Sequence, residues 1–417
     1  MNKHSSEALA PAARWHGLDA VRGFALLLGV ILHASMSFLP GAQYFWVASD
    51  SDQSITAAVI FYVIHNFRMI TFFLLAGFFA RMAFHRLGLR SFARDRWTRI
   101  GKPLLIGWPL LFSAIVAALA WGAMLKNGGS LPKETPPGPS FMPNDFPLTH
   151  LWFLYALALF YIVGLALRAV LVVGDKNTRL RQQIDRVVRV VMGWCAPLLL
   201  ALPVAISLFY QAQWYSWFGI PTPDHSLYLN VPAIVGFGSA FVFGWLLHRQ
   251  PDLLLRLQSR WAFYLLVAVA TTTLSLYLIG LTPALKPATP DLDTLIYALS
   301  YCTAAWSWTF VFIGMALRFL SQHSITRRYL SDASYWIYLV HLPLIMALQI
   351  AASRFELSWA IELPLMLVLA FIVMLLSYHL MVRNSMIGAT LNGRRQRDSA
   401  AKTATPTVVS SFGSETP

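Results

Sequence analysis

The chain has 417 residues, of which 57% are apolar, 14% aromatic and only 12% charged. A soluble fold of this length cannot bury so large an apolar fraction, so the composition predicts a membrane protein and excludes an ordinary soluble enzyme. The formal net charge of +14 would favour a nucleic-acid partner on a soluble domain. Here the basic residues stand between apolar segments, and we expect no nucleic-acid partner. Cys195 and Cys302 lie inside apolar stretches, which leaves neither a disulfide framework nor a zinc site.

Apolar runs long enough to cross a bilayer recur along the whole chain. They predict an all-α, polytopic membrane protein with about ten transmembrane helices, near residues 18–38, 55–80, 103–125, 149–171, 190–210, 230–247, 261–281, 295–317, 334–353 and 358–382. Residues 1–17 are predicted to form a cytoplasmic N-terminal arm, and residues 384–417 a disordered cytoplasmic tail. No cleavable signal is expected, because the first apolar run is too long and no small-residue cleavage pattern follows it.

The basic residues predict the orientation of these helices. With the N-terminus in the cytoplasm, the outer segments carry only Lys126, Lys133, Lys286 and Arg354 among the 32 Lys and Arg residues of the chain. The positive-inside rule therefore places both termini in the cytoplasm. Basic residues are densest in the predicted loop of residues 81–102. This density is explained either by orientation alone or by binding of phosphates, from a cytoplasmic donor or from anionic lipid head groups.

The first predicted helix, residues 18–38, carries Asp19, Arg22 and His33 in an otherwise apolar run. Polar groups at that depth are costly and indicate function. Arg22 and His33 are ~16 Å apart along the helix axis and leave the same face. For Arg22 the alternatives are an ion pair with Asp19 and a binding role. For His33 they are a structural imidazole held by a neighbouring helix and a catalytic group.

Further polar residues are expected at similar depth in three other helices. His65 and Arg68 share one face of the second helix, and an arginine in mid-membrane requires a partner. His150 begins the fourth helix and His341 lies in the ninth. Each also has a structural explanation, as an interfacial histidine beside Trp152 or as a donor to a carbonyl group freed by a proline. These side chains predict one site between the middle and outer thirds of the membrane, with no metal ion.

Five stretches of the sequence resemble a known family. The first is the spacing of Arg22 and His33, with ten residues between them; a Leu-Asp pair precedes Arg22 and a Gly-Phe pair follows it. The others are residues 64–69 (IHNFRM) running into FFLLAGFF, 96–109, 150–154 (HLWFL) and 333–343 (ASYWIYLVHLP). Together they resemble the membrane-bound acyltransferase-3 family, and within it the glucans biosynthesis protein C group, which is associated with succinylation of periplasmic glucans. Two departures are Ala76, where many members have serine, and Leu342, where that group has a second histidine.

The resemblance implies an acyltransferase transmembrane domain over residues 18–383, in the inner (cytoplasmic) membrane of a bacterium. It implies an O-acyltransferase without a bound cofactor, which moves an acyl group from cytoplasmic acyl-CoA to hydroxyls of a periplasmic glucan or surface polysaccharide. Succinyl-CoA is the favoured donor and acetyl-CoA the next. His33 matches the essential histidine, as general base or transient acyl carrier. We assign Arg22, Arg68, Arg96 and Arg99 to the donor, and Asp19, His65, His150, Trp152, Tyr338 and His341 to the pocket.

Arg68 is predicted to hold the distal carboxylate of a succinyl donor, because a substrate can bring the partner that this arginine requires. Outer-side aromatic residues, including Tyr44, Phe45, Trp46, Trp214, Tyr215 and Trp217, form either the interfacial belt or a platform for sugar rings. A different class of function, a transporter or flippase for a small anion or glycan, is the alternative. Besides the bilayer, acyl-CoA and the glycan, proteins of glycan synthesis are possible partners.

Overall fold

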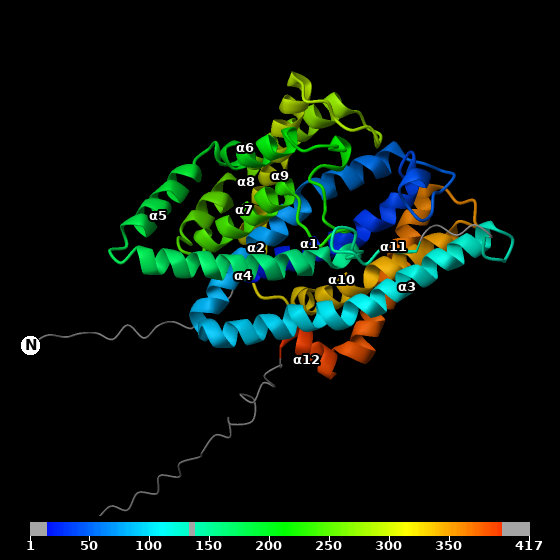
Figure 1. Cartoon of the computed structure of the whole chain (residues 1–417), viewed down its shortest axis with the longest axis horizontal. Helices are drawn as coiled ribbons and strands as arrows, with labels where there is room; N and C mark the ends of the chain where they lie inside the picture. Colours follow the sequence, from blue (N-terminus) through cyan, green and yellow to red (C-terminus); the bar gives the residue numbers. More distant parts are fainter. Residues whose placement is uncertain (1–14, 133–137, 394–417) are drawn as a thin grey trace, which may run out of the picture.

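The computed structural model describes residues 15–132 and 138–393 (Figure 1). Within those ranges the chain forms helices and no strands, which confirms the expected all-α class. The helices are α1 (His16–Ser35), α2 (Ile55–Arg96), α3 (Lys102–Lys126), α4 (Trp152–Gly174), α5 (Arg179–Val191), α6 (Ala196–Phe209), α7 (Val231–Leu247), α8 (Leu253–Ile279), α9 (Leu292–Phe319), α10 (Ile325–Ala352), α11 (Trp359–Ser377) and α12 (Met386–Asn392).

Every predicted membrane segment overlaps a helix, although the fifth, residues 190–210, spans the break between α5 and α6. Length and composition give fewer independent spans than ten. Seven candidate spans are found in the described part of the chain, or up to eight if α5 and α6, which meet at a bend of 106°, form one broken span. The second and third predicted helices run together as one candidate, Ile55–Lys126, and α7 is a shorter apolar helix. The chain is thus a multi-pass membrane protein, while the side on which each terminus lies stays a prediction.

Side-chain caps define the starts of several helices. Ser54 accepts a hydrogen bond from the Ala57 N–H at 3.3 Å, Asn230 from Ala233 at 2.8 Å, and Asp291 from Thr294 at 2.8 Å. Each cap satisfies a backbone donor that the first turn leaves free. The caps fix where α2, α7 and α9 begin.

The predicted loop of residues 81–102 is helical instead. Helix α2 continues to Arg96 and is interrupted only at Gly88, whose φ of 72° lies outside the helical region. A π-helical turn, Trp97–Gly101, then leads into α3. Glycine adopts positive φ without a steric penalty, so the chain bends here while its helical hydrogen bonding continues on both sides. Hydrophobic periodicity does not reveal this helix, because the dense basic residues end the apolar run.

The two predicted terminal segments are only partly described. Helix α1 starts at His16, two residues before the predicted boundary, and residues 1–14 lie outside the described ranges. The predicted tail of residues 384–417 begins with a helix, α12, rather than with an irregular chain. The predicted disorder of residues 394–417 falls outside the described ranges.

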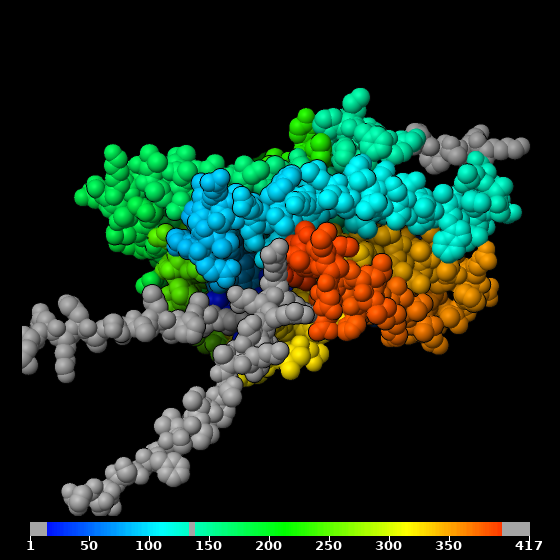
Figure 2. Space-filling model, turned by 90° about the horizontal axis from the view of Figure 1, so that it is seen from below, coloured from blue at the N-terminus to red at the C-terminus, as the bar shows by residue number. Residues whose placement is uncertain are grey.

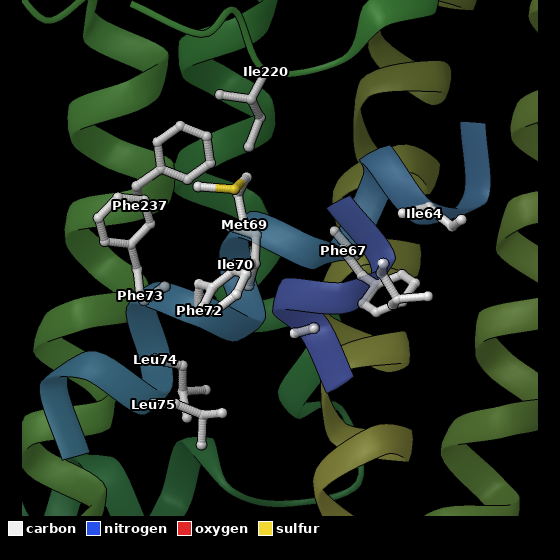
Figure 3. Close-up of a cluster of buried hydrophobic side chains, with 14 of the residues drawn as sticks. Ile64, Phe67, Met69, Ile70, Phe72, Phe73, Leu74, Leu75, Ile220 and Phe237 are labelled. Carbon is white, nitrogen blue, oxygen red and sulfur yellow. The ribbon is translucent and has the colours of Figure 1, made fainter. Parts of the chain in front are cut away.

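The centre of the molecule is built around α1 and α2. Helix α1 packs against α2, α9 and α10, while α7 lies on the other side of α2. Glycines permit this second contact, because a methyl group at Gly77 would collide with the Phe241 carbonyl and one at Gly244 with that of Leu74. The close approach of α2 and α7 therefore depends on these two glycines. Figure 3 shows the adjoining core, where the Phe73 ring of α2 lies against the Phe237 ring of α7, with centroids 5.1 Å apart.

Helix α3 lies on the outside of this centre. It packs along α10, and most of its side chains remain exposed. In the view of Figure 2 it crosses the molecule beside the orange and red C-terminal helices. Such an apolar and exposed helix suits contact with lipid.

Candidate active site

A cavity of about 640 Å³ lies between α1, α2, α4 and α10. Its walls include seven of the predicted site residues: His33, His65, Arg68, His150, Trp152, Tyr338 and His341. They come from α1, α2, α4 and α10 and, for His150, from the 3-10 turn Thr149–Leu151 that precedes α4. The structure thus brings these seven side chains together at one cavity, as the sequence predicts.

Three histidines form a continuous row in this cavity. The ring centroids of His33 and His341 are 5.2 Å apart, and those of His341 and His150 are 5.3 Å apart. His150 and His341 are 7% and 3% exposed, whereas His33 is partly exposed at the cavity wall. His33 is therefore the member of the row that a bound molecule reaches most directly.

Backbone carbonyl groups assign the tautomers of two of these rings. Nδ1 of His341 donates to the Tyr338 carbonyl at 2.7 Å, and Nε2 of His150 donates to the Leu339 carbonyl at 2.9 Å. In neutral His341 this leaves Nε2 as an acceptor. That atom is buried and has no hydrogen-bond partner in the described part of the chain, and the same holds for Nδ1 of His33. The row thus has acceptor capacity that the protein itself does not use.

Arg68 brings a positive charge to the same cavity. Its Nε is buried without a hydrogen-bond partner, and no carboxylate of the described residues forms an ion pair with it. Among the residues that the structure describes, the only carboxylate at the cavity wall is Asp224, in the loop before α7. A guanidinium left unpaired within a membrane helix is costly, so this site suits an anionic group brought by a ligand.

Gly29 makes room for that guanidinium. It lies one helical turn before His33, and a methyl group placed on it would collide with Nη1 of Arg68 and lie 3.9 Å from Nε2 of His341. The absence of a side chain therefore allows Arg68 to approach the backbone of α1 beside the histidine row.

We predict that Gly29→Ala lowers the acyl transfer implied by the sequence resemblance at least tenfold, although alanine favours a helix over glycine by about 1 kcal/mol. The reason is that the added methyl group displaces the Arg68 guanidinium. The measurement is the transfer rate of purified variants at matched folded concentration. Gly107→Ala on α3 is the matched control, because its methyl group would meet only Leu111, at 3.8 Å. Full activity of Gly29→Ala would show that the position of Arg68 is unimportant.

Gln349 of α10 connects His33 to the loop between α1 and α2 through hydrogen bonds. Its side-chain amide donates to the carbonyl groups of His33 and Ala34, at 3.0 and 3.1 Å, and accepts from the Trp46 indole N–H at 2.9 Å. The Trp46 ring in turn stacks on His33, with centroids 5.9 Å apart and planes inclined by 17°. These contacts fix both the end of α1 and the plane of the imidazole.

The mouth of the cavity is polar and aromatic. The loop between α6 and α7 contributes Gln211, Gln213, Thr222 and Asp224, and the aromatic lining residues there include Tyr215, Phe218, Phe45 and Trp46. Trp214 and Trp217, predicted among the same aromatics, are each only 1% exposed and belong to the core. The surface thus offers hydrogen-bonding groups next to flat apolar rings.

The structure places four predicted site residues outside this cavity. Arg22 pairs with Asp19 at 3.4 Å, and its guanidinium lies over the Phe79 ring. Asp19 is fourteen residues from His33, or about 21 Å along the helix, so its assignment to the acceptor pocket is wrong. Its spacing to Arg22 explains why it pairs locally instead.

Arg96 and Arg99 lie near the same end of the molecule as Arg22. Both form ion pairs with Asp95, at 2.5 and 2.9 Å, and Arg22 lies within electrostatic range of Arg99. The hydroxyl group of Tyr335 donates to the Arg99 carbonyl, and the Tyr335 ring lies 6.3 Å from that of Tyr338. Tyr335, Tyr338 and His341 therefore form a column on α10 that leads from this arginine group to the cavity.

Sequence reasoning does not identify Gly29 or Gln349 as site residues. A signal exists for each, because Gly29 precedes His33 by one turn and Gln349 is a polar residue two turns beyond His341. Within residues 15–132 and 138–393, no group of three or more His, Cys, Asp or Glu side chains is arranged to hold a metal ion.

The fold and site define a multi-pass membrane protein with a histidine- and arginine-lined cavity among its helices. The acyltransferase-3 family, described as an acyltransferase domain, matches residues 15–379, and the chain belongs to this family. The expected enzymatic class, an acyltransferase, is thereby confirmed, and the transporter alternative is set aside.

The curated relatives are similar over a shorter stretch. Glucans biosynthesis protein C of Shigella boydii serotype 4 (strain Sb227) and of Escherichia coli (strain K12) are each 34% identical to the chain over 101 residues. That stretch is 24% of this chain and 26% of each relative, so the alignment spans about a quarter of their length. No solved structure matches the chain.

Proposed function

We propose that the protein transfers an acyl group, succinyl first and acetyl next, from cytoplasmic acyl-CoA to hydroxyl groups of a periplasmic glucan or surface polysaccharide. The observation that carries this proposal is one cavity in which His33, His341 and Arg68 meet below a polar and aromatic mouth, with no carboxylate of the described residues paired to Arg68. The named relatives act in glucan biosynthesis, which favours a glucan as the acceptor.

In the proposed reaction His33 is the general base. It takes the proton of an acceptor hydroxyl as that oxygen attacks the thioester carbonyl carbon. The carbon–sulfur bond then breaks, and the proton passes from His33 to the leaving thiolate. In a second form of the same proposal, the neutral imidazole attacks the thioester carbon, the carbon–sulfur bond breaks and coenzyme A leaves as the thiol with the proton of the ring. The acceptor hydroxyl then attacks the acyl-imidazole, the carbon–nitrogen bond breaks and the proton of the hydroxyl returns to the ring. The stack on Trp46 and the bonds of Gln349 support either form, since both hold the ring in one orientation.

The donor is proposed to approach along α10. Arg22, Arg96 and Arg99 would bind the phosphates of coenzyme A at the cytoplasmic end, because guanidinium groups bind phosphate well. The column of Tyr335, Tyr338 and His341 would guide the pantetheine arm to His33. Arg68 would then pair with the distal carboxylate of a succinyl group, which supplies the partner that it lacks.

The acceptor is proposed to bind at the opposite mouth. Sugar rings present apolar faces that stack on aromatic side chains, while their hydroxyl groups need hydrogen-bond partners. Phe45, Trp46 and Tyr215 offer aromatic surfaces for stacking, and Gln211, Gln213 and Asp224 offer hydrogen-bond partners for the hydroxyl groups. His33 lies where these two sets of groups meet the deeper part of the cavity.

Mass spectrometry of periplasmic glucans and surface polysaccharides tests this function. We expect ester groups in cells that carry the intact gene and none of these esters in cells from which it is deleted. The added mass identifies the acyl group, about 100 Da for succinyl and about 42 Da for acetyl. Identical ester content with and without the gene would refute acyl transfer to these acceptors.

A further inference from the structure

A second cavity, of about 220 Å³, lies between α2, α4, α5 and α7. One of its lining residues, Arg81, is thirteen residues beyond Arg68 on α2, which is about 20 Å along the helix axis. Of the described residues, none that lines this cavity also lines the histidine cavity. It is therefore a separate site, which the proposed reaction does not use.

Four arginines line this second cavity, but only two of them are neutralised by carboxylates of the described residues. Arg249 binds Asp185 through two hydrogen bonds of 2.6 and 2.5 Å, and Arg181 binds Asp175 at 3.0 Å. No ion pair of Arg81 or Arg168 is found in the described part of the chain.

The two arginines without an ion pair differ in their surroundings. The guanidinium of Arg168 lies over the Phe84 ring, 4.4 Å from its centroid. Nε of Arg81 is buried and has no hydrogen-bond partner among the described residues. Asp185, which binds Arg249, is also within electrostatic range of Arg81. Four arginines thus stand against two described carboxylates, Asp185 and Asp175, which leaves an excess of positive charge at this small space beside His85.

The remaining wall of this cavity is apolar and continues onto the outer surface of the helices. Gly164 of α4 allows the Phe241 ring of α7 to approach, since a methyl group there would lie 3.2 Å from it. Leu167 and Val242, on either side, are 53% and 45% exposed. Because these helices are apolar, that exposure faces lipid rather than water.

The neighbouring helix α5 marks the boundary of the membrane. Its sequence, RLRQQIDRVVRVV, alternates basic and apolar residues at helical spacing, and it bends away from α6 by 106°. An amphipathic and basic helix of this kind lies in the plane of the interface. The charged end of the second cavity is thus at the level of lipid head groups and its apolar wall at the level of acyl chains.

We infer that this cavity binds an acidic glycerophospholipid from the surrounding leaflet. Its phosphate lies between Arg81 and Arg168, and one acyl chain follows the groove between α4 and α7. The charge excess matches an anionic head group, and basic pockets between membrane helices bind such lipids. A soluble phosphate ester would use the arginines but leave the apolar groove empty.

Native mass spectrometry of the purified full-length protein with added phosphatidylglycerol or phosphatidylcholine tests this inference. We expect phosphatidylglycerol to bind roughly 10- to 30-fold more tightly, as two arginines at a head group predict. The Arg81→Gln/Arg168→Gln protein should lose this preference, and the Arg81→Lys/Arg168→Lys protein should retain most of it. Arg86→Gln/Arg90→Gln, which removes two exposed charges of the same helix, should bind as the unchanged protein does.

Three results would overturn the inference. They are equal binding of the two lipids, an unchanged preference in the Arg81→Gln/Arg168→Gln protein, and displacement of phosphatidylglycerol by inorganic phosphate or by coenzyme A. The last result would assign the arginines to a soluble ligand.

A second measurement does not depend on the folding of the arginine variants. Trp245 lines the cavity, so phosphatidylglycerol with brominated acyl chains should quench part of the tryptophan fluorescence. This quenching should be absent from the Trp245→Phe protein, and it should be weaker when brominated phosphatidylcholine replaces brominated phosphatidylglycerol. Equal quenching by the two lipids, or quenching that is unchanged in Trp245→Phe, would contradict the site.

Discussion

Replacement of His33 by alanine is expected to lower acyl transfer by about 10²- to 10⁴-fold, which is the usual contribution of a positioned acid–base group. The His33 imidazole lies at the partly exposed end of the histidine row and stacks on Trp46. No other histidine of the described residues stacks on Trp46, so none is placed to replace it. The measurement is the ester content of glycans from cells with matched membrane levels of each protein, followed by rates with purified enzyme.

His225→Ala is the matched control for this experiment. His225 also lines the cavity, but at the mouth, where its side chain is 76% exposed and its Nε2 lies 3.5 Å from a carboxylate oxygen of Asp224. We expect this variant to keep a rate within a few-fold of the unchanged protein. If His33→Ala retained full ester content, His33 would be a structural residue and the proposed chemistry would fail.

Replacement of Arg68 by glutamine is expected to reduce the preference for succinyl over acetyl donors by tenfold or more. A hydrogen bond to a charged group contributes about 1.5–3 kcal/mol, and glutamine removes the charge while keeping a donor. Acetyl transfer should fall less, because an acetyl group brings no carboxylate to this site. The measurement is the ratio of kcat/KM for the two donors in each variant.

Arg68→Lys separates the charge of this residue from its shape. Lysine retains the positive charge but not the planar, two-pronged geometry, so we expect an intermediate preference. An Arg68→Gln enzyme that still preferred succinyl to the same degree would show that another group recognises the carboxylate. In that case the function of acyl transfer would stand and only the assignment of Arg68 would fall.

Much of the fold is predictable because a bilayer imposes simple rules on a sequence. Apolar runs of sufficient length must form helices there, and polar residues within them must have a purpose. For that reason the sequence alone is enough to group His33, His65, Arg68, His150 and His341, and these five residues share one cavity.

The errors have an equally definite origin. Asp19 is close to Arg22 and His33 in the sequence, but its depth along α1 separates it from the cavity. Charge density ends the hydrophobic run at residues 81–102 and so predicts a loop, yet charged residues form helices well at a membrane surface. Gly29 and Gln349 escape prediction because their roles depend on contacts between helices, which no single-helix pattern contains.

The link from Trp46 through Gln349 to the backbone of His33 has a consequence for how such enzymes diversify. In the proposed reaction, Trp46 offers a flat surface to the sugar and, through Gln349, also holds the backbone of the residue proposed as the base. A change at Trp46 that suits a new acceptor is therefore expected also to loosen the end of α1 and to lower the rate of transfer to every acceptor. The loop between α1 and α2 carries Trp46, and its partner on α10 is Gln349. Exchange of this loop between relatives should alter the range of acceptors without loss of turnover only when the residue at position 349 is exchanged with it.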